Sequence, residues 1–285
     1  MYCSHQVLKN LKKNIKVHRL KKALYGLKQT PRAWNKLIDA FMQKKGFMKC
    51  TVEFGLYVKE TKHQNLLIVC LYVDDLIVTG DMQSEIKQFK AKMKISFEMT
   101  DLEALSYFLG LEFVHTPHGI LMHKRKYACE VLKKFNMMDC NSTPIPVMVN
   151  LKLTEELDEK AVDATLFNQV IGSLRYLCNS RPNISYRVGL INRFMNNPRL
   201  PHMAAAKHIL RYLKGTLDLG LFFSRKTYQN QVKNGVVLEA WSDLDWCGDK
   251  VERKNTFDYL FKYMNAPIYW CSKKQNVVVL SSCAA

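Results

Sequence analysis

Residues 66–80, with the sequence LLIVCLYVDDLIVTG, constrain the fold of this chain more than any other stretch. An apolar run ends at two adjacent aspartates, Asp74 and Asp75, and a second apolar run follows them directly. Short apolar runs rich in β-branched residues favour buried strands. The pattern therefore predicts a β-hairpin over 65–80 with both aspartates at or near its turn.

The adjacent aspartates need a physical explanation, because burying an unpaired carboxylate is costly and a neighbouring like charge adds repulsion. Three arrangements avoid this cost: an exposed turn, a salt bridge, or coordination of a divalent metal ion. An exposed acidic turn is the simplest of the three. Two-metal phosphoryl transfer also uses clustered carboxylates, and Mg²⁺ prefers oxygen ligands while keeping water and substrate phosphates as its others. Apolar residues on both arms place the turn against a core, which favours the metal site.

The charge of the chain indicates a polyanionic partner. Its 285 residues hold 43 Lys and Arg against 25 Asp and Glu, which gives a net charge of +18 and a pI near 9.5. Such a balance favours nucleic acid or an acidic membrane surface, although a basic soluble protein without such a partner has the same composition. Residues 1–50 carry 13 Lys and Arg and a single acid, Asp39, which suits a phosphate backbone.

Cysteine spacing and hydropathy indicate the compartment. Nine cysteines are scattered without a C-x-x-C pair, which favours reduced thiols over a disulfide framework or a zinc site. Residues 1–22 are basic and lack the apolar core of a signal peptide, and the apolar run at 66–73 is too short to cross a bilayer. We expect a soluble intracellular protein, cytoplasmic or nuclear, that is not secreted and has no membrane partner. The sequence leaves the oligomeric state open.

Apolar periodicity and turn residues predict both helices and strands. Helices are expected at 30–46, 84–94, 126–137, 163–179 and 202–214. Strands are expected at 54–59, in hairpins over 65–80 and 106–124, and again from 236 onward. Residues 139–160 carry two prolines and an acidic patch without periodicity, and we interpret them as a linker. The length favours about two domains.

Several blocks of the sequence also resemble a known family. LYVDDLIVTG resembles the Y-x-D-D motif of reverse transcriptases in its copia-type retrotransposon form. Other blocks resemble further segments of the same Pol polyprotein and follow in the same order: KALYGLKQTPRAW, FEMTDLEALSYFLGLEF with GILMHKRKYACEVLKKFNM, the long block 172–216, and EAWSDLDWCGDKVERKNT with PIYWCSKKQNVVVLSS. The resemblance covers nearly the whole chain and implies a piece of such a polyprotein, truncated at both ends.

The resemblance implies an α+β fold. It comprises a reverse transcriptase palm-like antiparallel sheet with packed helices, a helical connection, and an incomplete ribonuclease H-like αβ module. The implied segments are a partial fingers, palm and thumb region (1–138), a linker (139–160), a helical connection region (161–235) and a truncated ribonuclease H-like segment (236–285).

The resemblance also implies an activity and its residues. Asp74 and Asp75 would be the catalytic ligands of Mg²⁺ in an RNA-directed DNA polymerase. Tyr72 would lie along the floor of the nucleotide site, and Lys28 and Gln29 would meet the nucleotide or template. The implied partners are an RNA and DNA template and primer, with deoxynucleoside triphosphates. For Lys28, a solvated lysine is the simpler interpretation.

The palm site departs from the family pattern. The family supplies a third carboxylate from a strand before the LYGLKQ block, whereas no Asp or Glu precedes Asp39 here, and Asp39 is expected on the surface of a helix. We therefore expect impaired polymerase activity. The alternative is a non-catalytic, basic retroelement remnant that binds nucleic acid; a remnant without activity that does not fold alone is a third hypothesis.

The ribonuclease H-like segment departs as well. Asp243 matches the first metal carboxylate of that site, Asp245 is interpreted as structural, and Ala284 stands where a second carboxylate would be. Asp258 and Met264 occupy positions where glycines commonly make bends with positive φ, so strained turns are expected there. We expect this segment to be inactive and incompletely folded.

Overall fold

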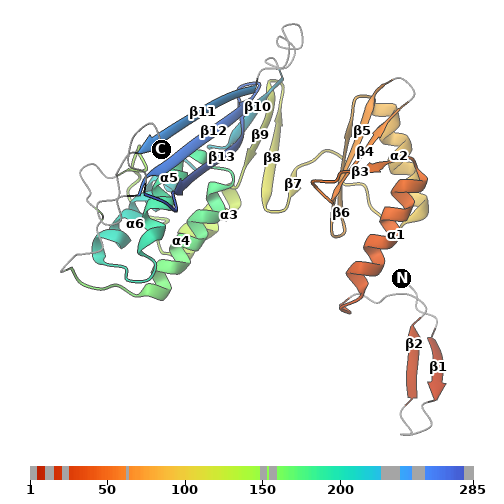
Figure 1. The fold of residues 1–285 in the computed structure, drawn as a ribbon, viewed down its shortest axis with the longest axis horizontal. Coiled ribbons are helices and arrows are strands. Elements are labelled where there is room, and N and C mark those ends of the chain that lie inside the picture. Colours follow the sequence, from red (N-terminus) through yellow and green to blue (C-terminus); the bar gives the residue numbers. More distant parts are fainter. Residues whose placement is uncertain are drawn as a thin grey trace. The chain divides into compact units, whose positions relative to one another are not determined.

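The computed structural model describes residues 5–9, 16–20, 26–61, 64–147, 153, 159–225, 238–245 and 254–278 (Figure 1). The chain divides into two compact units, Met1–Ala104 and Leu105–Ala285. Helices and antiparallel sheets occur in both, and this mixture confirms the predicted α+β class.

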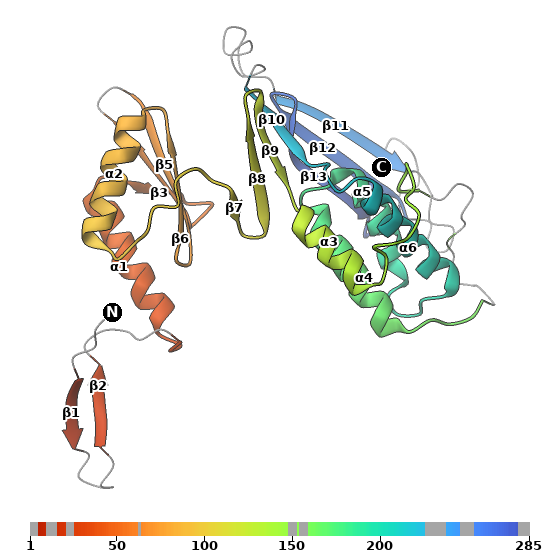
Figure 2. The same cartoon turned by 180° about the vertical axis from the view of Figure 1, so that it is seen from behind.

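The first unit contains six strands and two helices within its described residues: β1 (His5–Lys9), β2 (Lys16–Leu20), α1 (Thr30–Lys44), β3 (Met48–Lys49), β4 (Leu56–Glu60), β5 (Leu66–Tyr72), β6 (Asp75–Gly80) and α2 (Gln83–Ser96). Strands β1 and β2 pair with each other, and β3-β4-β5-β6 form a second antiparallel sheet in that order. Figures 1 and 2 show α1 and α2 on one face of this second sheet.

The core of the first unit explains why the helices lie on that face. Alternate residues of β5, namely Leu67, Val69 and Leu71, are buried, as the two-residue period of a strand requires. They pack with Ile38 and Met42 of α1. Helix α2 adds two further buried side chains, Phe89 and Met93. One face of the predicted hairpin is therefore sealed by both helices.

The second unit continues with the described elements β7 (Tyr107–Phe108), β8 (Leu111–Thr116), β9 (Gly119–His123), α3 (Arg125–Lys134), α4 (Ala164–Cys178), α5 (Pro182–Ile191), the 3₁₀ turn Asn192–Phe194, α6 (Leu200–Gly215), β10 (Leu221–Ser224), β11 (Leu238–Asp245), β12 (Thr256–Tyr263) and β13 (Ala266–Lys274). The strands form two antiparallel sheets, in the orders β10-β9-β8-β7 and β11-β12-β13.

Helices α3 to α6 share one hydrophobic core. Helix α4 begins after Asp163, whose carboxylate accepts hydrogen bonds from the backbone N–H groups of Thr165 (2.8 Å) and Leu166 (3.3 Å). It buries Phe167, Ile171 and Leu174 on one stripe, together with residues of α3, α5 and α6.

The last turn of α4 connects the helices to both sheets. Its carbonyl groups lack partners within the helix, as at any helix C-terminus. The Lys124 ammonium, directly after β9, donates to the carbonyl oxygen of Tyr176 at 2.9 Å. The indole N–H of Trp270 in β13 donates to the carbonyl oxygen of Cys178 at 2.9 Å. One face of the β11–β13 sheet is thereby fixed against the helices, and α5 packs on β13 (Figures 1 and 2).

Most predicted elements are confirmed, with small shifts at their ends. The hairpin over 65–80 is β5 and β6, the predicted helices correspond to α1, α2, α3, α4 and α6, and strands do follow residue 236. Helix α5 and the short strands β1, β2, β3 and β10 were not predicted. Pro182 and Gly189 interrupt the apolar pattern of α5, although proline suits the first turn of a helix.

The predicted segment boundaries at 138, 160 and 235 stay predictions, and part of the proposed linker (148–152 and 154–158) lies outside the described residues. The two compact units divide after Ala104. Helix α3, placed with the palm and thumb region by the sequence, contributes Ala128, Val131 and Leu132 to the core of the second unit.

The packing of α3 can be tested with one core substitution. Leu132 is fully buried, so Leu132→Ala should lower the free energy of unfolding by about 2–5 kcal/mol, through lost burial and the cavity left behind. Leu166→Ala, at an exposed position of α4, is the matched control and should change it by less than about 0.5 kcal/mol. Urea unfolding followed by circular dichroism measures both. Similar values for the two variants would contradict this arrangement of the core.

Candidate active site

The two adjacent aspartates lie at the tip of the β5–β6 hairpin. Tyr72 pairs with Asp75 across the strands, so Val73 and Asp74 form a two-residue loop. Both carboxylates are exposed, and neither has an ion pair or hydrogen bond within the described residues. Of the three arrangements considered from the sequence, this is the exposed turn, and its open carboxylates remain accessible to a metal ion.

Val73 adopts an unusual backbone conformation in this turn. Its φ is +53°, in the left-handed region that a β-branched residue rarely enters. Two-residue hairpin loops need positive φ to match the strand twist, and glycine or asparagine commonly provides it. A valine there costs about 1–3 kcal/mol, and it persists only where neighbouring structure outweighs that cost.

Trp34 of α1 supplies a contact that holds the turn. Its indole N–H donates a 2.7 Å hydrogen bond to the carbonyl oxygen of Val73. The Trp34 ring is itself held by an edge-to-face contact with Phe97, directly after α2, with ring centroids 5.4 Å apart. Phe41 packs on the same Phe97 ring at 5.0 Å. The candidate site is therefore fixed by both helices that cover the sheet.

Asp39 has a structural role that the sequence did not predict. It was expected on the surface of its helix, but it is half-buried and accepts a 2.9 Å hydrogen bond from the Tyr57 hydroxyl. Lys49 lies 3.2 Å from the same carboxylate oxygen. Burial, followed by the contact with Asp39, raises the pKa of Tyr57 to about 12. Asp39 thus ties α1 to the sheet.

The other predicted site residues lie close to these elements along the chain. Lys28 and Gln29 are exposed and immediately precede α1. Tyr72 ends β5 with 53% of its surface exposed. The contact of Trp34 with the turn was not predicted from the sequence. The one available signal was its indole N–H, which needs a partner when the ring packs.

The carboxylates of Asp74 and Asp75 are suitable ligands for a hard divalent cation, but there are only two of them at the turn. Aspartate oxygens are the ligands that Mg²⁺ prefers. Within the described residues, no group of three or more His, Cys, Asp or Glu side chains could hold a metal ion. Asp74 and Asp75 therefore offer two protein ligands, and the remaining ligands of a cation would come from elsewhere.

Comparison with known proteins identifies the family. The family model for reverse transcriptase (RNA-dependent DNA polymerase) matches residues 4–149, which include the Asp74–Asp75 turn. The chain is 36% identical over 269 residues to the retrovirus-related Pol polyprotein from transposon RE1 of Arabidopsis thaliana, covering 94% of this chain and 18% of that protein. The Pol polyprotein from transposon TNT 1-94 of Nicotiana tabacum is 34% identical over 278 residues, 94% of this chain and 20% of that protein.

The chain belongs to the reverse transcriptase family, in the form found in copia-type retrotransposon Pol polyproteins. This reverse transcriptase chain spans about a fifth of the length of those two polyproteins. A protein of Arabidopsis thaliana named an uncharacterized mitochondrial protein is 32% identical over 218 residues, 76% of this chain and 87% of that protein. No solved structure matches the chain at a significant level.

The region of this reverse transcriptase chain that carries Asp243 has a different local structure from the Asp74–Asp75 turn. Asp243 is exposed in β11 and faces Asp258 of β12 across the strands. Asp258 was expected at a strained bend, which is wrong because it lies inside β12. Met264 does have the expected positive φ, +48°, in the β12–β13 turn. Asp245 ends β11, and Ala284 lies outside the described residues.

Over the described parts of the reverse transcriptase chain, no helix is both long and apolar enough to span a bilayer.

The strain at Val73 can be measured by comparing two substitutions at that position. Both Val73→Gly and Val73→Ala remove an exposed side chain, but only glycine relieves the positive φ. Val73→Gly should therefore be more stable than Val73→Ala by about 1 kcal/mol in urea unfolding. At the exposed Thr79 of β6, without positive φ, the order should reverse, since glycine weakens a strand. If the glycine variant were the more stable one at both positions, or the alanine variant at both, the result would argue against strain at Val73.

The buried Tyr57 hydroxyl predicts a pH dependence of stability. The unfolded chain releases this proton near the ordinary pKa of 10.0, whereas the folded protein keeps it to about pH 12. The stabilisation is therefore complete below pH 10 and is lost as the pH rises toward 12. The difference in unfolding free energy between wild type and Tyr57→Phe should shrink across this interval when measured by urea titration. A constant difference would contradict the assignment.

Proposed function

We propose that this chain carries the palm hairpin of an RNA-directed DNA polymerase, with Asp74 and Asp75 as the carboxylates that bind Mg²⁺. The observation that carries the proposal is the presentation of both side chains, exposed, at a turn fixed by Trp34. A preorganised pair of oxygen ligands suits a hydrated cation that also binds substrate phosphates. The matched family model over residues 4–149 supports the same reaction class.

The roles of neighbouring residues follow from this proposal. When bound, Mg²⁺ would neutralise charge on the triphosphate and orient the attacking and leaving oxygens. The two aspartates hold that position on the hairpin, and Tyr72, at the end of β5, would form the floor beneath the nucleotide. Lys28 and Gln29, exposed before α1, would meet the nucleotide or the template.

The partners proposed for the chain are an RNA or DNA template with its primer, and deoxynucleoside triphosphates. The net charge of +18 supports binding to a phosphate backbone, because bound lysines and arginines release condensed counterions. Exposed basic side chains occur on α2 at Lys87, Lys92 and Lys94. Such binding weakens steeply as salt is added.

The number of carboxylates supports a lower activity than in a complete palm site. Two-metal sites hold their ions about 3.5–4 Å apart. Two aspartates cannot by themselves fix two metal ions at that separation. Asp39, the first acidic residue of the sequence, is engaged by Tyr57 and Lys49 and so is not open to a metal ion. The second candidate function is therefore a non-catalytic nucleic-acid binder that keeps the basic surface without the chemistry.

We also propose that residues 236–285 are the start of a ribonuclease H-like module that lacks activity in this chain, following a helical connection at 161–235. The antiparallel order β11-β12-β13, with Asp243 on the first strand, supports the assignment. Its inactivity would follow from the single matched carboxylate, because metal-assisted hydrolysis also needs clustered oxygen ligands. Asp258, opposite Asp243, is the first residue to replace if cleavage of an RNA–DNA hybrid is ever observed.

Primer extension on an RNA template separates the two candidate functions. A polymerase should give Mg²⁺-dependent product that Asp74→Asn lowers at least about 100-fold, since the substitution removes a charged ligand at the reacting phosphates. Glu60→Gln is the matched control, because Glu60 is exposed and pairs with Leu66, at the far end of β5 from the turn. Product that survives in Asp74→Asn would contradict the assigned site.

The same preparations are used to measure binding to the template and primer. Salt-sensitive binding by wild type and Asp74→Asn, without product at any Mg²⁺ or Mn²⁺ concentration, supports the non-catalytic binder. Affinity that does not change with salt would contradict both candidate functions.

A further inference from the structure

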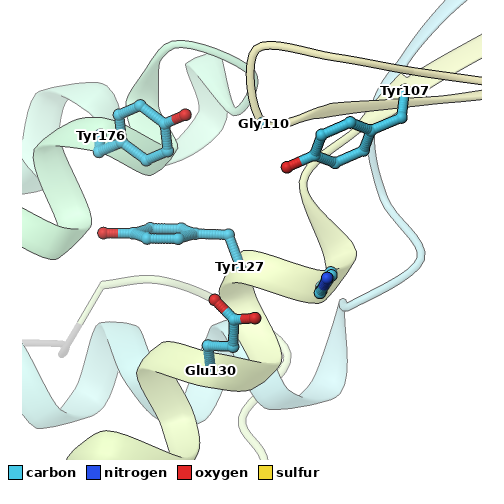
Figure 3. Close-up of a pocket in the computed structure, with 6 residues that line it drawn as sticks. Tyr107, Gly110, Tyr127, Glu130 and Tyr176 are labelled. Carbon is cyan, nitrogen blue, oxygen red and sulfur yellow. The ribbon is translucent and has the colours of Figure 1, made fainter. Parts of the chain in front are cut away.

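The second unit contains a cavity of about 240 Å³ that the proposed chemistry does not use. We name it the tyrosine pocket; its lining residues are Tyr107, Gly110, Lys126, Tyr127, Glu130 and Tyr176. They come from β7 and the turn after it, from α3 and from α4. Figure 3 shows Tyr176 and Tyr127 on one side of an open space and Tyr107 on the other, with its hydroxyl directed into the space.

Two of the three rings are held firmly by their neighbours. Tyr127 and Tyr176 pack edge to face with their centroids 4.7 Å apart. The Lys124 ammonium lies 3.3 Å from the centroid of the Tyr176 ring while it donates to the Tyr176 carbonyl oxygen. Only 5% of Lys124 is exposed, and its burial lowers the pKa of the ammonium to about 8. The two rings are thus fixed by their mutual packing and by the buried ammonium, although Tyr176 keeps 37% of its surface exposed.

The turn between β7 and β8 keeps the pocket open. Leu109 and Gly110 both have positive φ, +50° and +80°. The Tyr176 hydroxyl donates a 3.2 Å hydrogen bond to the carbonyl oxygen of Leu109, and a Cβ at Gly110 would overlap that hydroxyl. Glycine is therefore required both by the backbone conformation and by the close approach of Tyr176.

The remaining polar groups of the pocket have no partners in the described protein. The Tyr107 and Tyr127 hydroxyls, the Lys126 ammonium and the Glu130 carboxylate make no side-chain hydrogen bond or ion pair within the described residues. Lys126 and Glu130 are four positions apart on α3, where opposite charges commonly pair, yet they remain apart. Tyr107 is 58% exposed. These polar groups line the same pocket, and the Tyr107 hydroxyl is directed into its open space (Figure 3).

We propose that the tyrosine pocket binds one unpaired nucleobase of a single-stranded RNA or DNA segment. The proposal rests on the nucleic-acid binding proposed above and adds a site to it. An exposed ring such as Tyr107 stacks on any base, because every base has a π-face. The Glu130 carboxylate can only accept hydrogen bonds and so suits the amino group of a base, while Lys126 suits the adjoining phosphate.

Size and charge favour a base over other ligands. Pockets for drug-sized molecules measure about 300–1,000 Å³, so a cavity of about 240 Å³ suits a single planar ring system better than a whole nucleoside triphosphate. An aromatic cage for a quaternary ammonium would not place the Lys126 ammonium at its lining. The net charge of +18 also attracts a polyanion to the surrounding surface.

Binding of two synthetic strands to the full chain tests the proposal. One strand carries a single central 2-aminopurine and is otherwise abasic; the other has the same length and is entirely abasic. Wild type should bind the 2-aminopurine strand about tenfold more tightly, since one stacked base contributes about that much, and it should quench the 2-aminopurine fluorescence. Tyr107→Ala should abolish both effects, and Tyr107→Phe, which keeps the ring, should retain them.

Control variants make the result specific to the tyrosine pocket. Tyr263→Ala removes another exposed tyrosine of the second unit and should leave the preference and the quenching unchanged. Glu130→Gln should reduce the preference while quenching persists. If wild type binds both strands equally and this binding still weakens with salt, the tyrosine pocket does not bind a base. The proposed function would not be contradicted by that result. Failure to bind either strand at low salt would instead overturn the nucleic-acid binding on which the pocket rests.

Discussion

The hydrogen bond from Trp34 to the carbonyl oxygen of Val73 is the contact on which the geometry of the Asp74–Asp75 turn, here called the aspartate turn, depends. A valine at φ +53° is unfavourable by itself, so the turn needs support from outside the hairpin. Trp34 provides it, and Phe97 after α2 fixes Trp34 in turn. The turn therefore owes its shape to the packing of two helices against a sheet. A short motif with the same letters but without these helices would lack that constraint.

The second unit solves a similar problem at the end of α4. Unpaired carbonyl groups at a helix C-terminus must find donors, and here the donors come from distant segments. Lys124 reaches Tyr176 over 52 positions of sequence, and Trp270 reaches Cys178 over 92. A buried ammonium is tolerated because the Tyr176 carbonyl and ring both stabilise its charge. The contacts of Lys124 with the carbonyl oxygen and with the ring orient Tyr176. The Tyr176 hydroxyl then fixes the β7–β8 turn.

Local patterns were sufficient to predict most of the longer elements but not these connections. The alternation of β5 and the apolar stripe of α1 are periodic signals, and both elements lie where the sequence places them. Strands β3 and β10 have two and four residues, too few for a period, and exist because β4 and β9 offer edges to pair with. The aspartate turn was predictable from its flanks, whereas its contact with Trp34 joins residues 39 positions apart.

The aspartate turn and the basic charge of the chain create an electrostatic conflict. A chain of net charge +18 attracts phosphates, yet Asp74 and Asp75 repel them at the turn. Because both carboxylates are exposed, water and salt screen their mutual repulsion, and the folded protein tolerates the pair without a partner. The repulsion returns when a phosphate approaches and displaces that water. A divalent cation held by the two carboxylates would remove the conflict, since it would attract both groups. The sign of the charge at the turn therefore disfavours direct contact between the turn and a nucleic-acid backbone and supports the proposed metal-binding role of Asp74 and Asp75.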